Sequence, residues 1–329
     1  MDWNNTNVFV TGAGGFIGSH LCSHLVQLGA KVTAMLHYNS RSDWSNLEFL
    51  HEETQKSMHV VKGNVEDSSF MDAKTKGQNI IFHLAALIGI PYSYEAPLSY
   101  VKTNIQGTVN VLEAARKNDV DLVINTSTSE TYGTAVYTPI DELHPLQGQS
   151  PYSATKIAAD KLAESYFNSF ALPIVTVRPF NTYGPRQSSR AVIPTIVSQL
   201  LTKEEIFLGG LAPVRDFTYV EDTVKGFIAA AEAESIYGEL INLGFGKASS
   251  IKDLVHLVMK VSGIHKPVKT AKERMRPKDS EVLELICDNS KALDLLRWKP
   301  EVSLNEGLEK TINFISQNIN LFKKNHYTI

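Results

Sequence analysis

Short apolar runs alternate with longer amphipathic segments over the first half of the chain. Apolar residues repeat at helical spacing in 15–29, 97–118 and 150–170, which predicts three helices. The apolar runs are rich in Val and Ile, and we predict buried strands at 6–12, 31–36, 58–63, 79–86, 120–128 and 173–179. Strands that alternate with helices in this way predict a parallel sheet with helices on both faces. We therefore expect an α/β fold with a Rossmann-type doubly wound parallel sheet.

The regular alternation ends near residue 180, where the loops lengthen and glycine and proline become frequent. We expect a strand near 215–220, and helices at 191–202, 221–234, 250–262 and 303–318. The sequence thus predicts a dinucleotide-binding Rossmann domain at 1–180 and a smaller α/β region at 181–329 that binds the substrate. We expect the chain to cross between the two parts at some point.

Composition excludes several classes of protein. The 329 residues carry a net charge of −3 and contain no long basic block, so neither nucleic acid nor an anionic membrane is an expected partner. Cys22 and Cys287 are the two cysteines, too few for a disulfide framework. No signal peptide and no apolar stretch of about 18 residues is present, which favours a cytoplasmic protein. His20 and His24 lie four apart without a third ligand, and we predict no metal site.

A glycine-rich turn joins the first predicted strand to the first predicted helix. The segment TGAGGFIGSHL places Gly12, Gly15 and Gly18 three residues apart. In a dinucleotide-binding turn the first glycine permits the tight turn, the second admits a pyrophosphate to the helix N-terminus, and the third lets helix and strand pack closely. A plain strand–turn–helix corner is the alternative, but the position of the motif favours cofactor binding.

The end of the second strand indicates which dinucleotide binds. Enzymes that prefer NAD usually carry an acid there for the ribose 2′-hydroxyl. His37 occupies this position, followed by Ser40 and Arg41, and the first acid is Asp43. A nearby arginine suits a 2′-phosphate, so we predict NADP, with NAD as the alternative.

Tyr152 and Lys156 lie four residues apart at the start of the helix 150–170, on one helical face. A neighbouring ammonium favours the phenolate, so we expect Lys156 to lower the pKa of Tyr152. A phenolate can remove a proton from a sugar hydroxyl while hydride leaves the carbon for a nicotinamide.

With these residues in view, the chain resembles the extended short-chain dehydrogenase/reductases that act on nucleotide sugars. The matching segments span nearly the whole chain and are TGAGGFIGSHL, GNVEDSS, FHLAA, TNIQGTVNVLEAA, YSATK, RPFNTYGPRQ and VRDFTYVEDTVKG. The resemblance implies that Tyr152 and Lys156 are catalytic. It also implies cofactor contacts near the pyrophosphate from Phe16 and Ile17, near the adenine from Asn64 and Val65, and along the cofactor from Leu84, Ala85 and Ala86. The family commonly has Asp where Asn64 stands.

The segment NTSTSETYG after the fifth strand indicates the chemistry within this family. Its Thr128, Ser129 and Glu130 are similar to the Thr-Ser-Glu of GDP-mannose 4,6-dehydratases, whereas dTDP-glucose 4,6-dehydratases have Thr-Asp-Glu and 4-epimerases have Ser followed by small residues. By this resemblance Glu130 removes the C5 proton after oxidation at C4, and Thr128 bonds the C4 oxygen. Ser129 is too weak an acid to protonate the C6 leaving group alone, so protonated Glu130 or a water held by Ser129 is needed.

The second half of the chain matches the family's nucleotide-sugar segments. The resemblance implies substrate contacts from Asn181, Ala191, Val192, Arg215, Arg276 and Asp279, while the apolar loop 86–97, with Ile88, suits an N-acetyl group. The chain is most similar to bacterial 4,6-dehydratases of N-acetylglucosamine nucleotides in legionaminic or pseudaminic acid pathways. UDP-N-acetylglucosamine is therefore the expected substrate, and a GDP-linked or other hexose stays open. The rival functions are a nucleotide-sugar 4-epimerase and a non-catalytic cofactor-binding protein. In relatives the helices 97–118 and 150–170 form a four-helix interface, so we expect a homodimer.

Overall fold

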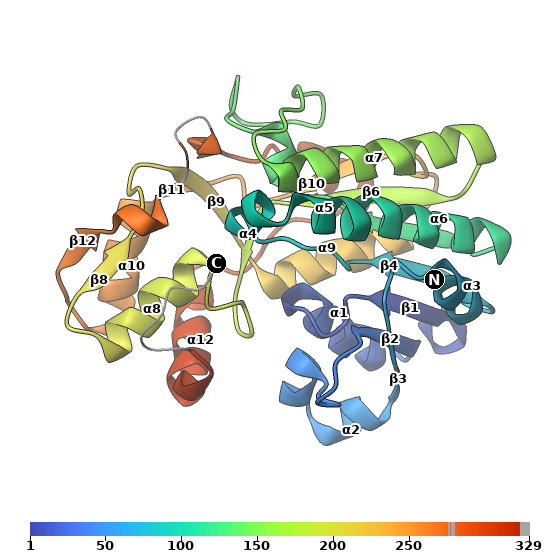
Figure 1. The fold of residues 1–329 in the computed structure, drawn as a ribbon, viewed down its shortest axis with the longest axis horizontal. Coiled ribbons are helices and arrows are strands. Elements are labelled where there is room, and N and C mark those ends of the chain that lie inside the picture. Colours follow the sequence, from blue (N-terminus) through green and yellow to red (C-terminus); the bar gives the residue numbers. More distant parts are fainter. Residues whose placement is uncertain (276, 278–279, 323–329) are drawn as a thin grey trace.

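A seven-stranded parallel sheet forms the centre of the larger part of the molecule. The structure is a computed structural model that describes residues 1–275, 277 and 280–322 (Figure 1). The strand order is β10-β6-β5-β4-β1-β2-β3, and every neighbouring pair is parallel. The strands are β1 (Asn7–Thr11), β2 (Lys31–His37), β3 (Met58–Gly63), β4 (Ile80–His83), β5 (Leu122–Thr126), β6 (Ile174–Pro179) and β10 (Leu240–Leu243). This arrangement confirms the predicted Rossmann-type sheet.

Helices cover both faces of the sheet, because its strands are apolar on both sides. One face packs against α1 (Phe16–Gln27) and α9 (Val220–Glu232), and the other against α3 (Ser68–Thr75), α6 (Gly107–Lys117) and α7 (Pro151–Phe170). The segment predicted as one helix at 97–118 is divided into α5 (Pro97–Tyr100), a π-helical stretch η3 (Val101–Gln106) and α6. The prediction of one continuous α-helix was thus wrong for the middle of this segment. Asn104, a buried amide within the π-helical stretch, bonds to the neighbouring loop and to α7.

Local sequence sets the start of α7, the helix that carries Tyr152 and Lys156. Ser150 accepts from the Ser153 backbone N–H, and the Ser153 hydroxyl bonds back to Ser150, which makes a capping box. Pro151 follows at the first helical position, where its missing N–H costs nothing. The helix ends where Ala171 adopts a left-handed conformation. These signals place Tyr152 in the first helical turn, at the carboxyl edge of the sheet.

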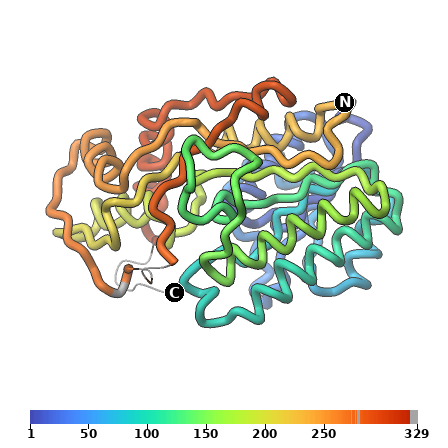
Figure 2. The backbone as a smooth tube through the Cα atoms, turned by 90° about the horizontal axis from the view of Figure 1, so that it is seen from above, coloured from blue at the N-terminus to red at the C-terminus, as the bar shows by residue number. Residues whose placement is uncertain are grey.

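The residues after Phe180 mostly build a second, smaller α/β region at one end of the molecule, yellow to orange in Figure 2. Its strands are β7 (Asn181–Tyr183), β8 (Ile206–Leu208), β9 (Val214–Tyr219), β11 (Ala248–Ser250), β12 (Val268–Thr270) and β13 (Glu284–Leu285). β9 pairs with β7, β11 and β13, while β8 pairs with β12. Three helices, α8 (Val192–Thr202), α10 (Ile251–Ser262) and α12 (Leu304–Gln317), pack on one another beside these strands.

The remaining elements are short and connect the main ones. They are η1 (Trp3–Asn5), η2 (Ser45–Phe49), α2 (Glu52–Lys56), α4 (Ile90–Glu95), η4 (Ser129–Tyr132), η5 (Lys272–Arg274), α11 (Ser290–Leu296) and η7 (Ile319–Leu321). Among the described residues, no helix has both the length and the apolar character needed to span a bilayer.

The chain returns to the main sheet after leaving it. β10 lies beside β6, with Ile241 paired to Val177, so a strand from the second half completes the first sheet. Burial explains this return, because Ile241 and Leu243 are fully buried against β6 and α9. A crossing of the chain between the two parts was expected, but no strand was predicted at 240–243.

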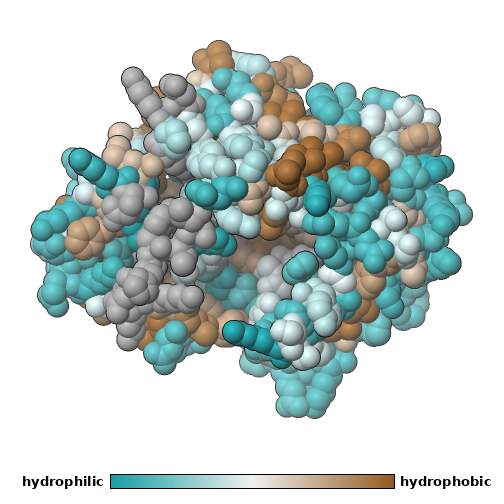
Figure 3. All heavy atoms as spheres, viewed as in Figure 1, coloured by the Kyte–Doolittle hydropathy of each residue, from teal (hydrophilic) through white to brown (hydrophobic). Residues whose placement is uncertain are grey.

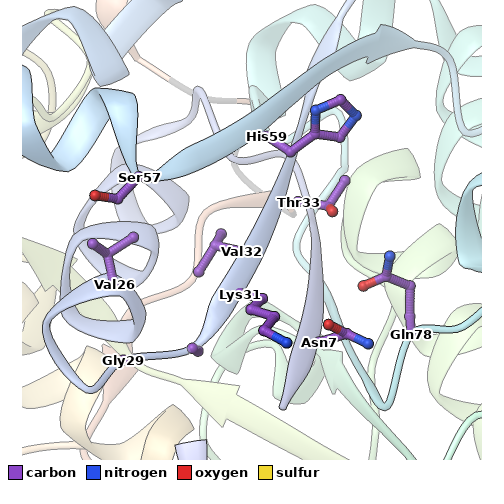
Figure 4. Close-up of a pocket in the computed structure, with 10 residues that line it drawn as sticks. Asn7, Val26, Gly29, Lys31, Val32, Thr33, Ser57, His59 and Gln78 are labelled. Carbon is purple, nitrogen blue, oxygen red and sulfur yellow. The ribbon is translucent and has the colours of Figure 1, made fainter. Parts of the chain in front are cut away.

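The amino ends and the carboxyl ends of the strands carry different sets of residues. A pocket of about 430 Å³ lies at the amino ends of β1, β2 and β3, where Asn7, Lys31, His59 and Gln78 line it (Figure 4). None of the predicted site residues lines this pocket. The glycine turn, His37, Asn64, Leu84 and Thr128 instead lie at or just after the carboxyl ends of β1 to β5, where ligands bind in open parallel sheets. On the face shown in Figure 3, the surface is hollowed between the sheet domain and the smaller region.

Candidate active site

The three motif glycines form a close-packed corner between β1 and α1. Gly12 has a φ of +70°, and a Cβ there would lie 2.8 Å from the backbone nitrogen of Ala85. A Cβ on Gly18 would lie 2.3 Å from the Gly12 carbonyl oxygen, and one on Gly15 would lie 3.0 Å from the same oxygen. Larger residues would therefore push α1 away from β1 and fill the space in front of the helix. The corner has the shape that a pyrophosphate needs.

The first turn of α1 is open to a ligand. The helix begins at Phe16, and its N-cap, Gly15, offers no side chain to the free N–H groups of that turn. Phe16 and Ile17 are partly buried against the core of the sheet domain. An anion at this position would gain both the N–H groups and the positive end of the helix dipole.

A chain of hydrogen bonds holds the loop after β4 in place. Thr11 Oγ1 accepts from the backbone N–H groups of Leu84 and Ala85, both at 3.1 Å. Its own proton must then point to His83 Nδ1, 2.9 Å away, so His83 carries its proton on Nε2 and donates to Thr108. Burial lowers the pKa of His83 to about 3, with a smaller contribution from the charge of Lys156, so the ring is neutral. Leu84 and Ala85, with Ala86 next in the chain, form a firm wall beside the glycine corner.

The predicted adenosine contacts lie at the adjacent strand ends. His37 and Gly63 are register partners at the carboxyl ends of β2 and β3. Asn64 follows and uses its side-chain oxygen to accept from the Glu66 N–H, while Val65 is buried and its carbonyl accepts from Asn110.

The segment after His37 is polar and open to solvent. Ser40 and Arg41 are exposed, and the Arg41 backbone N–H donates to Asn39. One oxygen of Asp43 accepts from Asn39 and Ser45, and Ser45 lies against Gly14 of the glycine turn. The segment therefore offers an exposed cation, Arg41, and an acid, Asp43, whose partner Ser45 lies against the glycine turn.

Tyr152 and Lys156 are both buried on the inner face of α7. Lys156 Nζ donates to the Thr126 carbonyl oxygen at 2.6 Å, and burial lowers the pKa of this lysine. Burial disfavours the charged form of Tyr152 as well, and it therefore raises the pKa of this phenol. The sequence predicted the opposite shift. The hydrogen bond from Thr128 lowers that pKa, and the charge of Glu130 raises it. The prediction was wrong because the spacing in sequence shows the neighbouring lysine but not the loss of water around the phenol.

Thr128 and Glu130 approach Tyr152 from the end of β5, opposite α7. Thr128 caps the short helix η4 by accepting from the Glu130 N–H, so its hydroxyl proton is left for Tyr152. Glu130 is partly exposed at the start of η4, whereas Ser129 is buried. The structure thus brings Thr128, Glu130 and Tyr152 together at the ends of β5 and α7.

The second region supplies a further wall of the site. Asn181 begins β7, and its side-chain oxygen is buried with no hydrogen-bond partner in the described structure. Ala191 is the N-cap of α8, which starts at Val192 and has no side-chain cap. A phosphate at such a helix start would be bound by backbone N–H groups. Ile88 is exposed in the loop between β4 and α4.

The arginines predicted to hold the nucleotide differ from one another. Arg215 is buried in β9, donates to the Val214 carbonyl oxygen, and lies 3.4 Å from the Glu281 carboxylate. It therefore already has a carboxylate partner in this structure. Arg276 and Asp279 lie outside the described residues.

Sequence reasoning missed a buried charged group one helical turn beyond Lys156 on α7. Asp160 on α7 and Arg178 on β6 form an ion pair at 2.6 Å, and Ser127 bonds to both. The i, i+4, i+8 spacing of Tyr152, Lys156 and Asp160 was a signal that could have found it. Within the described residues, no group of three or more His, Cys, Asp or Glu side chains is placed to hold a metal ion.

The residues at this edge fit a nicotinamide dinucleotide. The glycine corner would hold its pyrophosphate, the ends of β2 and β3 its adenosine, and Tyr152 and Lys156 the nicotinamide end. When bound, such a cofactor accepts and returns hydride.

Comparison with known proteins agrees with this geometry. The family model described as GDP-mannose 4,6 dehydratase matches residues 9–311. A UDP-glucuronate 4-epimerase from Thermodesulfobacterium geofontis is 32% identical over 95% of this chain and 97% of its own length. The solved UDP-glucuronic acid 4-epimerase from Bacillus cereus, in complex with UDP-glucuronic acid and NAD, is 30% identical with a TM-score of 0.86, and covers 95% of this chain and 100% of its own.

A second solved structure represents the other chemistry of the family. The dTDP-glucose 4,6-dehydratase from Streptomyces venezuelae with NAD bound is 26% identical with a TM-score of 0.87, and covers 97% of this chain and 99% of its own. Relatives of both kinds thus match almost the whole chain, and the matched region contains both the glycine corner and the Tyr152–Lys156 pair. The chain belongs to the extended short-chain dehydrogenase/reductase family of nucleotide-sugar-modifying enzymes, which includes 4,6-dehydratases and 4-epimerases.

Proposed function

We propose that this protein is a nucleotide-sugar 4,6-dehydratase, a lyase that converts UDP-N-acetylglucosamine to its 4-keto-6-deoxy form. The observation that carries the proposal is the position of Glu130 at the start of η4: its backbone N–H donates to Thr128, and its charge raises the pKa of Tyr152. A 4-epimerase needs a phenol and a lysine but no carboxylate beside them. A dehydratase needs that carboxylate as well, because the C5 proton must be removed by a base.

Each of the described side chains has its own role in the proposed reaction. Tyr152 takes the proton of the C4 hydroxyl, and the positive charge of Lys156 on the same face of α7 offsets part of the burial that raises the pKa of this phenol. Thr128 donates to the oxygen at C4, where negative charge develops when C5 loses its proton to Glu130. Protonated Glu130 then gives this proton to the hydroxyl that leaves C6 as water. The 4-keto-6-deoxy product is complete when C6 takes back the hydride that a bound nicotinamide would have accepted from C4, and C5 takes a proton. Ser129, buried next to Glu130, holds the geometry of this turn or a water within it.

The substrate assignment rests on the walls of the site. The unpartnered side-chain oxygen of Asn181 and the uncapped N-terminus of α8 suit a diphosphate sugar. Ile88 is apolar and exposed in the loop before α4, which favours an N-acetyl group at C2. Arg215, Arg276 and Asp279 are proposed contacts for the nucleotide, and a GDP-linked sugar is the alternative.

The direct test is product analysis. The protein is incubated with UDP-N-acetylglucosamine and the oxidised cofactor, and a product lighter by one water is expected. GDP-, dTDP- and CDP-linked sugars serve as the comparison panel. A product of unchanged mass with inverted C4 would show instead the epimerase function, which the named epimerase relatives favour. No product from any sugar of the panel would favour a non-catalytic cofactor-binding protein.

We propose NADP as the cofactor, with NAD as the alternative. Arg41 and Ser40 support NADP because they are exposed just after β2, where a 2′-phosphate would lie. The bound NAD of the solved relatives, and Asp43 near the glycine turn, support the alternative. Binding of both cofactors is measured by calorimetry on the protein and on Arg41→Ala. The proposal expects tighter NADP binding and a selective loss of it in the variant, and tighter NAD binding would overturn it.

We also propose a homodimer formed through the face that contains α5 and η3. Leu98 is 74% exposed and Val101 is 43% exposed on adjacent turns of this face. Apolar side chains gather over the same part of the surface in Figure 3. An exposed apolar patch of this kind is typical of a protein interface.

A further inference from the structure

Three side chains form a closed polar group behind the catalytic helix. Asp160 Oδ2 accepts from Arg178 at 2.6 Å and from the Ser127 hydroxyl at 2.5 Å. The Ser127 oxygen in turn accepts from Arg178 Nε at 3.1 Å. All three are more than nine-tenths buried: Ser127 directly follows β5, Asp160 lies on α7 and Arg178 lies on β6. This group is therefore fixed by three elements of the sheet domain.

Additional contacts hold the arginine in one orientation. Its guanidinium lies 4.4 Å from the ring centre of Tyr132, and the Tyr132 hydroxyl donates to Asn242 on β10. Asp160 Oδ1 and Arg178 Nη1 are buried without hydrogen-bond partners in the described structure. A buried ion pair with unused atoms is costly to maintain compared with apolar packing. Structural stability alone is a weak reason for such a pair, which points to a role of the pair toward the residue beside it.

That neighbour is Lys156, one helical turn before Asp160 on the inner face of α7. Burial lowers the pKa of Lys156, the charge of Asp160 raises it, and the charge of Arg178 lowers it. The other groups around Lys156 are the Thr126 carbonyl on β5, the neutral His83 on β4, and Tyr152 in the first turn of α7. Glu130 on η4 faces Tyr152 from the opposite side.

We propose that Asp160 is a positioning residue that keeps Lys156 charged, and that Arg178 and Ser127 set how strongly it does so. Arg178 and Ser127 both bind Oδ2, which fixes the carboxylate and balances part of its charge. The part of the Asp160 charge that Arg178 and Ser127 do not balance attracts the ammonium of Lys156, one helical turn away on α7. The proposal rests on the catalytic role of Lys156 in the proposed function, but not on the choice between dehydratase and epimerase.

The effect on pH dependence follows from the charges. Removal of the Asp160 charge leaves Lys156 buried and opposed by Arg178, so the pKa of Lys156 falls and the ammonium is lost at a lower pH. Removal of the Arg178 charge has the opposite sign, because Asp160 then acts on Lys156 without opposition. Asp160 also raises the pKa of Tyr152, so its loss moves both limbs of a pH–rate profile to lower pH.

The test is an NMR titration that needs neither sugar nor cofactor. The Lys156 signal is assigned in protein with ¹³C-labelled lysine by its absence in Lys156→Met. In Asp160→Asn we expect the midpoint to fall by about one pH unit or more, the size of effect that a close opposite charge has. In Arg178→Gln we expect it to rise. In the double variant, which leaves no uncompensated charge and protects folding, we expect a midpoint between those of the two single variants.

Two further variants separate positioning from simple structure. Asp160→Glu keeps the charge and should restore the midpoint, while Glu164→Gln removes an exposed carboxylate one turn further along α7 and should leave it unchanged. Single variants that shift the midpoint in the same direction, or leave it unshifted, would overturn the proposal. Because no substrate is present, this result is independent of the outcome of the product analysis. With the identified substrate, the limbs of kcat/KM against pH should move with the NMR midpoints.

Discussion

Lys156 Nζ donates to the main-chain carbonyl oxygen of Thr126 at 2.6 Å. This bond joins the catalytic helix to the last residue of β5, two residues before Thr128. The ammonium is thereby held at the end of the strand from which Thr128 and Glu130 continue. The relationship places the Tyr-x-x-x-Lys helix beside the Thr-Ser-Glu segment, as the proposed reaction at C4 and then C5 requires.

Replacement of Glu130 by Gln should stop the elimination of water and leave the fold intact. The amide cannot remove the C5 proton, so we expect turnover to fall by about 10²-fold or more. The measurement is product formation from the identified substrate by mass spectrometry, together with exchange of the C5 proton for solvent deuterium. Glu52→Gln, an exposed acid on α2, is the control. Turnover by Glu130→Gln equal to that of the unchanged protein would contradict the assigned role.

The glycine corner should not tolerate a methyl group at Gly18. A Cβ there would lie 2.3 Å from the Gly12 carbonyl oxygen, so α1 must shift away from β1. We expect Gly18→Ala to lower the free energy of unfolding by about 1–3 kcal/mol, as overpacking does, and to weaken dinucleotide binding at least tenfold. Denaturant unfolding and calorimetry measure the two effects. Gly210→Ala, where the nearest atom would lie 3.4 Å away, is the matched control.

The neutral state of His83 should make stability depend on pH. Its folded pKa of about 3 lies below the ordinary value of 6.5, so the protein is most stabilised above pH 6.5 and loses this contribution as the pH falls. The expected loss from His83 approaches about 1.4 kcal/mol per pH unit below that point. The check is urea unfolding at several pH values.

Variants identify the histidine responsible. His83→Gln should flatten the pH dependence, while His265→Gln, which changes an exposed ring, should not. The buried His20, whose pKa is also lowered to about 3 by burial and by Arg186, contributes with the same sign and remains in both variants. An identical slope for His83→Gln and the unchanged protein would show that the ring is not neutral in the folded state.

A charge at Leu98 should separate the proposed dimer. The side chain is 74% exposed, so glutamate can replace it in the monomer without loss of buried packing. In the interface, the same glutamate would lose its water without a partner charge. We therefore expect Leu98→Glu to be monomeric by light scattering at concentrations where the unchanged protein is dimeric. Leu293→Glu, at an exposed position on α11, is the control, and a monomeric unchanged protein would refute the proposal.

The sequence alone determined the architecture and the main candidates of the site. Apolar periodicity located the first six strands of the sheet, because β-branched apolar runs between helices have few other places to go. Gly12, Gly15 and Gly18 were recognisable because a tight turn, a bound pyrophosphate and a closely packed helix require glycines at this spacing. Tyr152 and Lys156 were recognisable because four residues make one helical turn. Each of these is a local property, so the order of residues expresses it directly.

Tertiary structure decided what depends on residues distant in sequence. β10 joins the sheet beside β6 because its apolar residues find a buried partner there, and the local pattern did not show it. The pKa of Tyr152 is raised rather than lowered, since burial by several elements outweighs a neighbour four residues away. Asp160 and Arg178 are 18 residues apart and form a pair only because α7 packs on β6. Desolvation and charge pairing depend on the whole folded environment, and for this reason the sequence determined the residues of the site but the fold determined their charges.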